Sequence, residues 1–70
     1  MKDYLVIYEQ SEVGAWGAHT PDVDGVIALG ASKDEVEVGI KEALLAHIAY
    51  LRSEGLPVPE PHVAVGYVAA

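Results

Sequence analysis

The sequence predicts an α+β fold in the order β-β-β-α-β, a three- to four-stranded sheet with one helix packed on one face. Three observations predict it. Short β-rich apolar segments alternate with turn residues over positions 4–30. One amphipathic segment with capping signals at both ends follows them. After a proline-rich stretch at 57–61, apolar residues recur in a final run.

Apolar runs and the turns between them define the first three strands. Residues 4–8, YLVIY, form a continuous aromatic and β-branched run that ends at the polar stretch EQSEVG. Residues 15–20, AWGAHT, lie at hairpin distance from that run, and Trp16 favours a pleated surface. Residues 26–30, VIALG, follow the turn-forming stretch PDVDG and supply the third strand.

Capping residues mark both ends of the expected helix. Ser32 and Glu35 have the spacing of a capping box, in which each side chain accepts a hydrogen bond from the other residue's backbone N–H. Gly55 is placed as the C-terminal cap residue, and the prolines at 57–61 prevent continuation. Residues 62–69, HVAVGYVA, are expected to add the last strand. The apolar stripe that is expected to lie on the sheet consists of Val36, Ile40, Ala43, Leu44, His47, Ile48 and Leu51.

The composition excludes several classes of function. The 11 Asp and Glu residues against 4 Lys and Arg give a formal net charge of −7, which repels phosphate backbones and anionic lipid and attracts a basic partner. We therefore expect no direct binding to nucleic acid or membranes. The absence of cysteine rules out disulfides and a Cys-based zinc site. The apolar run near the start is too short for a signal peptide, so a cytoplasmic location is expected.

The segment PDVDGVIALGAS contains the strongest candidates for a metal or phosphate site. Asp22 and Asp24 occupy alternate positions of a tight loop, but the further oxygen ligands that a hard cation needs do not follow. The simpler interpretation is that Asp22 stabilises the turn after Pro21 through an Asx-type hydrogen bond. Gly25 and Gly30 are not clustered as in a phosphate-binding loop and predict a positive-φ turn or a close chain approach. No metal or cofactor is therefore expected.

No catalytic set is expected either. A ribonuclease H-type nuclease needs several carboxylates that converge on two metal ions, and the predicted strands at 4–8 and 15–20 contain none. The three histidines show no metal-ligand spacing. The acidic residues Asp34, Glu35 and Glu37 are explained by the helix dipole, although they are also a candidate contact for a basic partner. We therefore expect a protein that is not an enzyme.

The order and spacing of these residues resemble the HicB-like antitoxin domain, over the range from Tyr4 to Pro61. The resemblance implies a partial ribonuclease H-like fold without nuclease activity, which neutralises a small basic HicA-type mRNA-cleaving toxin by covering its active site. Ala31 departs from the acidic or polar residue that the family often carries before the helix cap. The residues that carry the resemblance are Pro21, Asp22, Gly25, Gly30, Ser32, Glu35, the triplet Glu42 to Leu44, and Gly55 with the prolines that follow it.

Residues 1–70 are interpreted as a single domain of this type, without the C-terminal DNA-binding domain that many members carry. Operator binding by this chain alone is therefore not expected. The leading hypothesis is a non-enzymatic antitoxin that binds a basic ribonuclease toxin. The alternative is a solitary domain that serves as a homo-oligomeric ligand-binding or scaffold module, and a degenerate hydrolase comes third. A short basic protein encoded by the neighbouring open reading frame would favour the antitoxin.

A homo-oligomer, either a dimer or a dimer of dimers, is expected from the apolar pattern of the strands. Alternate residues of a strand point to opposite faces, and in 4–8 both sets are apolar. A single helix covers only one face, so the other would remain a large exposed patch in a monomer. A second apolar stripe on the helix, which includes Val38 and Leu45, and the apolar residues of the last predicted strand, such as Tyr67, add to this surface. The candidate interface residues are Tyr4, Val6, Tyr8, Trp16, Val38, Leu45 and Tyr67.

Overall fold

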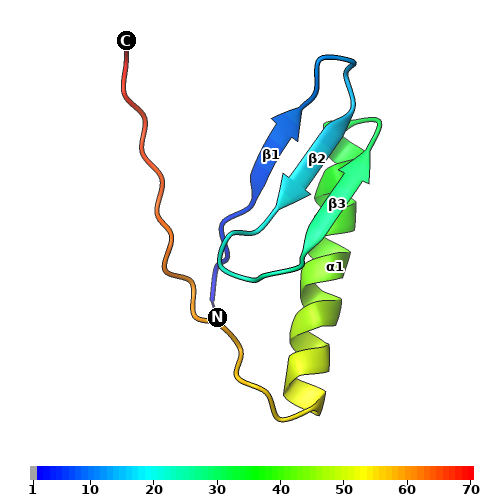
Figure 1. Ribbon diagram of the computed structural model, residues 1–70, viewed down its shortest axis with the longest axis vertical. Helices are drawn as coiled ribbons and strands as arrows, with labels where there is room; N and C mark the ends of the chain where they lie inside the picture. Colours follow the sequence, from blue (N-terminus) through cyan, green and yellow to red (C-terminus); the bar gives the residue numbers. More distant parts are fainter. Residues whose placement is uncertain (1) are drawn as a thin grey trace.

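Figure 1 shows the computed structural model, which describes residues 2–70. The strands β1 (Ile7–Gln10), β2 (Trp16–His19) and β3 (Ile27–Gly30) form one antiparallel sheet in the order β1-β2-β3. The helix α1 (Lys33–Ser53) crosses one face of this sheet. The predicted α+β class, with three strands followed by one helix, is confirmed. Within residues 2–70, no helix combines the length and apolarity needed to cross a bilayer.

The register of the sheet decides which residues face the helix. Ala18 on the central strand lies opposite Tyr8 on one side and Ala28 on the other, and all three pack toward α1. Side chains alternate between the two faces of a strand, so the next residues point away from the helix. The row of paired residues on that outer face is Ile7, His19 and Ile27.

The first strand begins later than the predicted run at 4–8. If the register of β1 and β2 continued, Leu5 would lie opposite Pro21. Proline has no backbone N–H and cannot donate to a strand ladder. Pairing therefore begins at Ile7, and the preceding residues leave the sheet.

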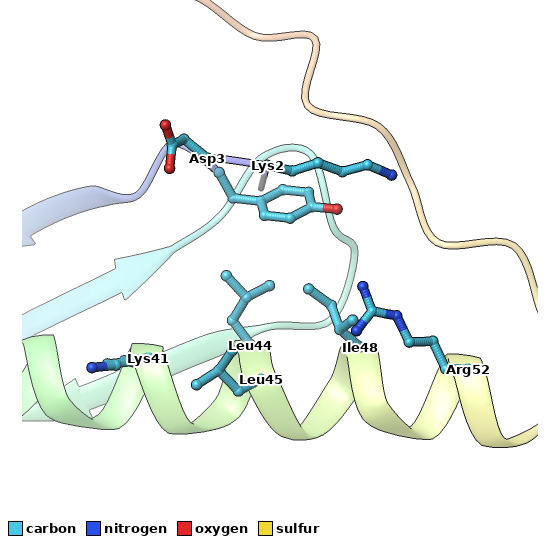
Figure 2. Close-up of a pocket in the computed structure, with 8 residues that line it drawn as sticks. Lys2, Asp3, Lys41, Leu44, Leu45, Ile48 and Arg52 are labelled. Carbon is cyan, nitrogen blue, oxygen red and sulfur yellow. The ribbon is translucent and has the colours of Figure 1, made fainter.

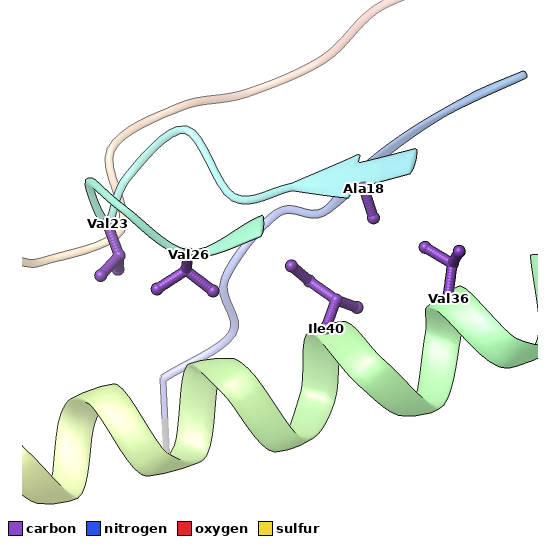
Figure 3. Packing of buried hydrophobic residues seen from close by; sticks show 5 residues of the cluster. All are labelled: Ala18, Val23, Val26, Val36 and Ile40. Carbon is purple, nitrogen blue, oxygen red and sulfur yellow. The ribbon is translucent and has the colours of Figure 1, made fainter. Parts of the chain in front are cut away.

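The core lies between the sheet and the helix. In Figure 3, Val36 and Ile40 project from α1 toward Ala18 of β2 and toward Val23 and Val26, which precede β3. These five side chains are buried. They confirm that the predicted helical stripe faces the sheet. The partly buried residues packed around them are Tyr4, Val6, Tyr8, Trp16, Ala28, Ala43 and Leu44.

The start of α1 confirms the predicted cap at Ser32, but the Glu35 side chain bonds to a different backbone N–H from the one predicted. The Oγ atom of Ser32 accepts a hydrogen bond from the backbone N–H of Glu35 at 3.2 Å. The reciprocal bond differs from a capping box, because Glu35 Oε2 accepts from the N–H of Ala31, not Ser32, at 3.0 Å. A Cβ atom on Gly30 would lie only 3.1 Å from Glu35 Oε2. The glycine thus leaves room for the glutamate to reach Ala31.

Replacing Ser32 by alanine is expected to lower the free energy of unfolding by about 1 kcal/mol, the usual cost of losing an N-cap oxygen. Glu35→Gln should cost less, because its amide oxygen still accepts a hydrogen bond from Ala31. Thermal unfolding followed by circular dichroism measures both changes. Unchanged stability in Ser32→Ala would show that this cap does not hold the helix start.

The end of α1 confirms the role predicted for Gly55. This residue has a φ of +67°, a conformation that glycine adopts without steric cost. The N–H of Gly55 donates to the carbonyl of Arg52, and the N–H of Leu56 donates to that of Leu51. Together the two bonds form a Schellman motif, which ends the helix. The proline-rich stretch then leads the chain back toward the N-terminal segment.

The predicted last strand, residues 62–69, is wrong for the single chain. Residues 54–70 form no helix or strand beyond a turn at the helix end, and the final part extends away from the sheet in Figure 1. The N–H groups of His62 and Val63 donate to the side chain of Asp22 instead of to a strand. The radius of gyration is consequently 13.5 Å, whereas a compact chain of this length has a value of about 11 Å.

Candidate interaction surfaces

The loop between β2 and β3 holds a buried carboxylate. The side chain of Asp22 is 0% exposed. Its Oδ1 atom accepts from the backbone N–H groups of His62 at 3.0 Å and Val63 at 3.2 Å, and lies 2.8 Å from Nδ1 of His62. The predicted Asx-type turn is therefore wrong, because this carboxylate binds a segment 40 residues away. Its buried Oδ2 atom has no hydrogen-bond partner within residues 2–70.

Two further contacts hold the same C-terminal segment. The hydroxyl of Tyr4 donates to the carbonyl of Pro59 at 2.6 Å. The Nζ atom of Lys2 lies 2.7 Å from a carboxylate oxygen of Glu60. Residues 59–63 are thus fixed by three side chains from the first third of the chain. We call these contacts to residues 59–63 the C-terminal anchor. The sequence did not predict the anchor, because its partners lie far apart along the chain and follow no periodic pattern.

The other predicted turn residues have the conformations expected of them. Gly25 has a φ of +81°, and Gly30 lies in close contact with Glu35 and Val36. Asp24 is exposed, whereas Asp22 is buried, so the two do not face one cation. Over residues 2–70, no three His, Cys, Asp or Glu side chains are grouped as metal ligands would be.

The sheet face that points away from α1 is apolar and exposed. Ile27 is 64% exposed and Leu29 is 82% exposed. The side chain of Leu29 lies over Gly17 of the neighbouring strand, where an added Cβ would be 3.3 Å from Leu29 Cδ2. Glu9 and His19 join them around a shallow depression of about 290 Å³. We call this surface the outer sheet face.

The segment that contains the sheet carries acidic residues and no basic ones. Residues 3–32, which contain all three strands, include no Lys or Arg. Within this segment Glu9 lines the outer sheet face, so a partner there meets an apolar centre beside a carboxylate, which favours a cationic surface. The acids in this range are Asp3, Glu9, Glu12, Asp22 and Asp24.

The structure separates the candidate interface residues into two groups. Val38 and Leu45 are exposed on α1, and Tyr67 is 97% exposed in the C-terminal segment. The others pack against the core of their own chain on the helix side of the sheet, so much of their surface is already covered. This group consists of Tyr4, Val6, Tyr8 and Trp16. Sequence reasoning missed Ile27 and Leu29, although the run VIALG is apolar on both faces.

A groove of about 940 Å³ lies between the N-terminal segment and the second half of α1 (Figure 2). Its apolar lining includes Tyr4 and Ile48, and its charged lining includes Lys2, Lys41 and Arg52. Three of the 4 Lys and Arg residues of the chain thus gather here. Asp3 also lines the groove, and Lys2 is paired with Glu60, so the groove carries charges of both signs.

The remaining cation lies at the start of α1. Lys33 contacts Glu37 at 2.6 Å and lies 4.7 Å from the centre of the Tyr8 ring. The hydrogen bond to Glu37 and the charge of that carboxylate raise the pKa of Lys33. Lys33 therefore stays charged and neutralises acid at the helix, not at the outer sheet face.

Comparison with known proteins gives no match: no family model matches the chain, and no curated protein or solved structure is significantly similar to it. The resemblance of the sequence to one family therefore stays an expectation. The outer sheet face, the groove and the C-terminal anchor are the features from which a function is inferred.

Proposed function

We propose that the protein is a cytoplasmic, non-enzymatic antitoxin of the HicB-like type that forms homo-oligomers and masks a small basic mRNA-cleaving toxin of the HicA type. The observation that carries the proposal is the outer sheet face, which is apolar and exposed, is lined by Glu9, and belongs to a segment, residues 3–32, that contains no Lys or Arg. The sequence resemblance supplies the class of partner.

The chemistry of the outer sheet face suits a ribonuclease as partner. An enzyme that cleaves RNA needs a cationic surface to bind the phosphate backbone. Leu29 and Ile27 offer that enzyme an apolar centre, and Glu9 beside them offers a charge in place of an RNA phosphate. Bound in this way, the chain would compete with RNA for the same surface of the toxin.

The carboxylates of the sheet region support binding better than catalysis. Metal-assisted RNA cleavage needs several carboxylates directed at one point. Here the buried carboxylate of Asp22 is used by the C-terminal anchor, and Glu9 lies on the outer sheet face. Asp24 is exposed in the loop. The three acids therefore lie in different settings and do not converge on one point.

The variant Leu29→Arg tests which surface binds the toxin. It removes an exposed apolar side chain and adds a charge that repels a cationic partner, so the Kd for a basic ribonuclease toxin should rise at least about tenfold. The matched control is Val38→Arg, the same kind of change at an exposed position of α1. Isothermal titration calorimetry measures both variants. A weaker complex with Val38→Arg and an unchanged one with Leu29→Arg would contradict the assignment.

Toxin association should depend on salt through its on-rate. The −7 charge steers a cationic partner over a distance that salt shortens. We expect the on-rate to fall about tenfold between low salt and half-molar salt, with a smaller change in the off-rate. Surface plasmon resonance at several ionic strengths gives both rates. An on-rate that does not respond to salt would show that the acidity serves another purpose.

A further inference from the structure

The C-terminal segment has the composition of a strand but no strand partner. Residues 64–70 are extended, and their backbone makes no hydrogen bond with the rest of residues 2–70. Val65 and Tyr67 are exposed, as is Val68. β-branched and aromatic residues at alternate positions favour a pleated sheet. A segment of this kind leaves apolar surface and backbone groups in water unless another sheet takes it up.

The C-terminal anchor sets where this segment leaves the molecule. Residues 59–63 are held by Tyr4, Lys2 and the buried carboxylate of Asp22. Beyond the anchor the chain runs outward on the side of β1 and diverges from it (Figure 1). Because the N–H groups of His62 and Val63 donate to Asp22, they are not available to pair with a strand of their own sheet.

The sheet offers an edge that can receive such a strand. The central strand is β2, so β1 pairs on one side only and its other side presents unpaired backbone groups. An open edge of this kind is a template for a strand from another chain. We infer that residues 64–69 of one copy add as a strand to the β1 edge of a second copy, which returns its own segment in the same way.

Reciprocal exchange closes a two-fold dimer and leaves neither segment exposed. Each copy gains a fourth strand, and Val65 and Tyr67 become cross-strand neighbours of β1. The inference rests on the homo-oligomer in the proposed function and names the element that forms it. It does not depend on the identity of the toxin.

Sedimentation equilibrium of the full chain at micromolar concentration tests the exchange. The parent protein should sediment at twice the chain mass of 7.4 kDa. Val65→Asp places a charge in the added strand and should raise the Kd of the dimer at least about tenfold. The control is Val13→Asp, at an exposed apolar position in the turn between β1 and β2, which should leave the Kd unchanged.

A second experiment locates the segment. The chain contains no cysteine, so introduced thiols are the only ones present. A short bismaleimide added to a mixture of Glu9→Cys and Val65→Cys chains should link one chain of each kind. The Glu9→Cys/Val65→Cys double variant should give links between chains, and links confined to single chains would overturn the exchange.

The outcomes separate this inference from the proposed oligomer. A dimer that Val65→Asp weakens no more than Val13→Asp overturns the exchange while the homo-oligomer stands. A parent protein of 7.4 kDa at all concentrations overturns both.

Discussion

Ile40→Ala is expected to lower the free energy of unfolding by about 3 to 4 kcal/mol. Ile40 is 2% exposed and projects from the middle of α1 into the core that Ala18 and Val26 complete. Truncation removes buried apolar contacts and leaves a cavity, and the opposite sheet cannot move far enough to fill it. A domain of this size has a stability of only a few kcal/mol, so most of the variant should be unfolded at 25 °C.

Urea denaturation followed by circular dichroism measures this loss. The matched control is Val38→Ala, which lies two residues away on the same helix and is 59% exposed. This exposed position should change the stability by less than about 0.5 kcal/mol. Equal losses in the two variants would contradict the assignment of the buried face of α1.

Asp22→Ala should produce the second largest loss of stability, about 2 kcal/mol. The buried Oδ1 atom accepts two backbone hydrogen bonds, and bonds to a charged group contribute more than those between neutral groups. Without the carboxylate, the N–H groups of His62 and Val63 lose their partner and the C-terminal segment is released. Asp22→Asn should lose less, because its amide oxygen still accepts both bonds.

Urea titration gives the loss for each variant, and amide hydrogen exchange at His62 and Val63 reports the release of the segment. Both amides should exchange faster in Asp22→Ala than in the parent protein. Asp24→Ala, in the same loop but exposed, is the control and should change neither measurement. Slow exchange at both amides in Asp22→Ala would mean that other contacts hold this segment.

Much of the fold could be predicted because its signals are local. The helix ends were predicted from Ser32 and Gly55, and the structure places a cap at both. The buried stripe of α1 followed from helical spacing. The three strands followed from apolar runs between turns. Their limits were less well predicted, since the start of β1 depends on Pro21, which belongs to another part of the chain.

The functional surfaces could not be predicted as fully, because they depend on long-range contacts. The sequence around Asp22 predicts a turn in either case, whether its side chain bonds to its own loop or to His62. The predicted strand at 4–8 is apolar on both faces, so its sequence does not say which face the helix covers. Alternation in residues 62–69 predicted a strand, but pairing needs an edge that the segment can reach. In this chain residues 62 and 63 are bound to Asp22, and the chain beyond them runs away from the sheet.

The measurement that tests the central claim most directly is RNA cleavage by a small basic ribonuclease of the HicA type, the partner that the proposal requires, with and without the chain present. The proposal predicts that equimolar chain abolishes cleavage, and that the chain alone leaves RNA intact with magnesium or manganese. Cleavage that continues undiminished in an excess of the chain, or RNA degradation by the chain itself that is lost in Asp24→Asn, would contradict a non-enzymatic antitoxin.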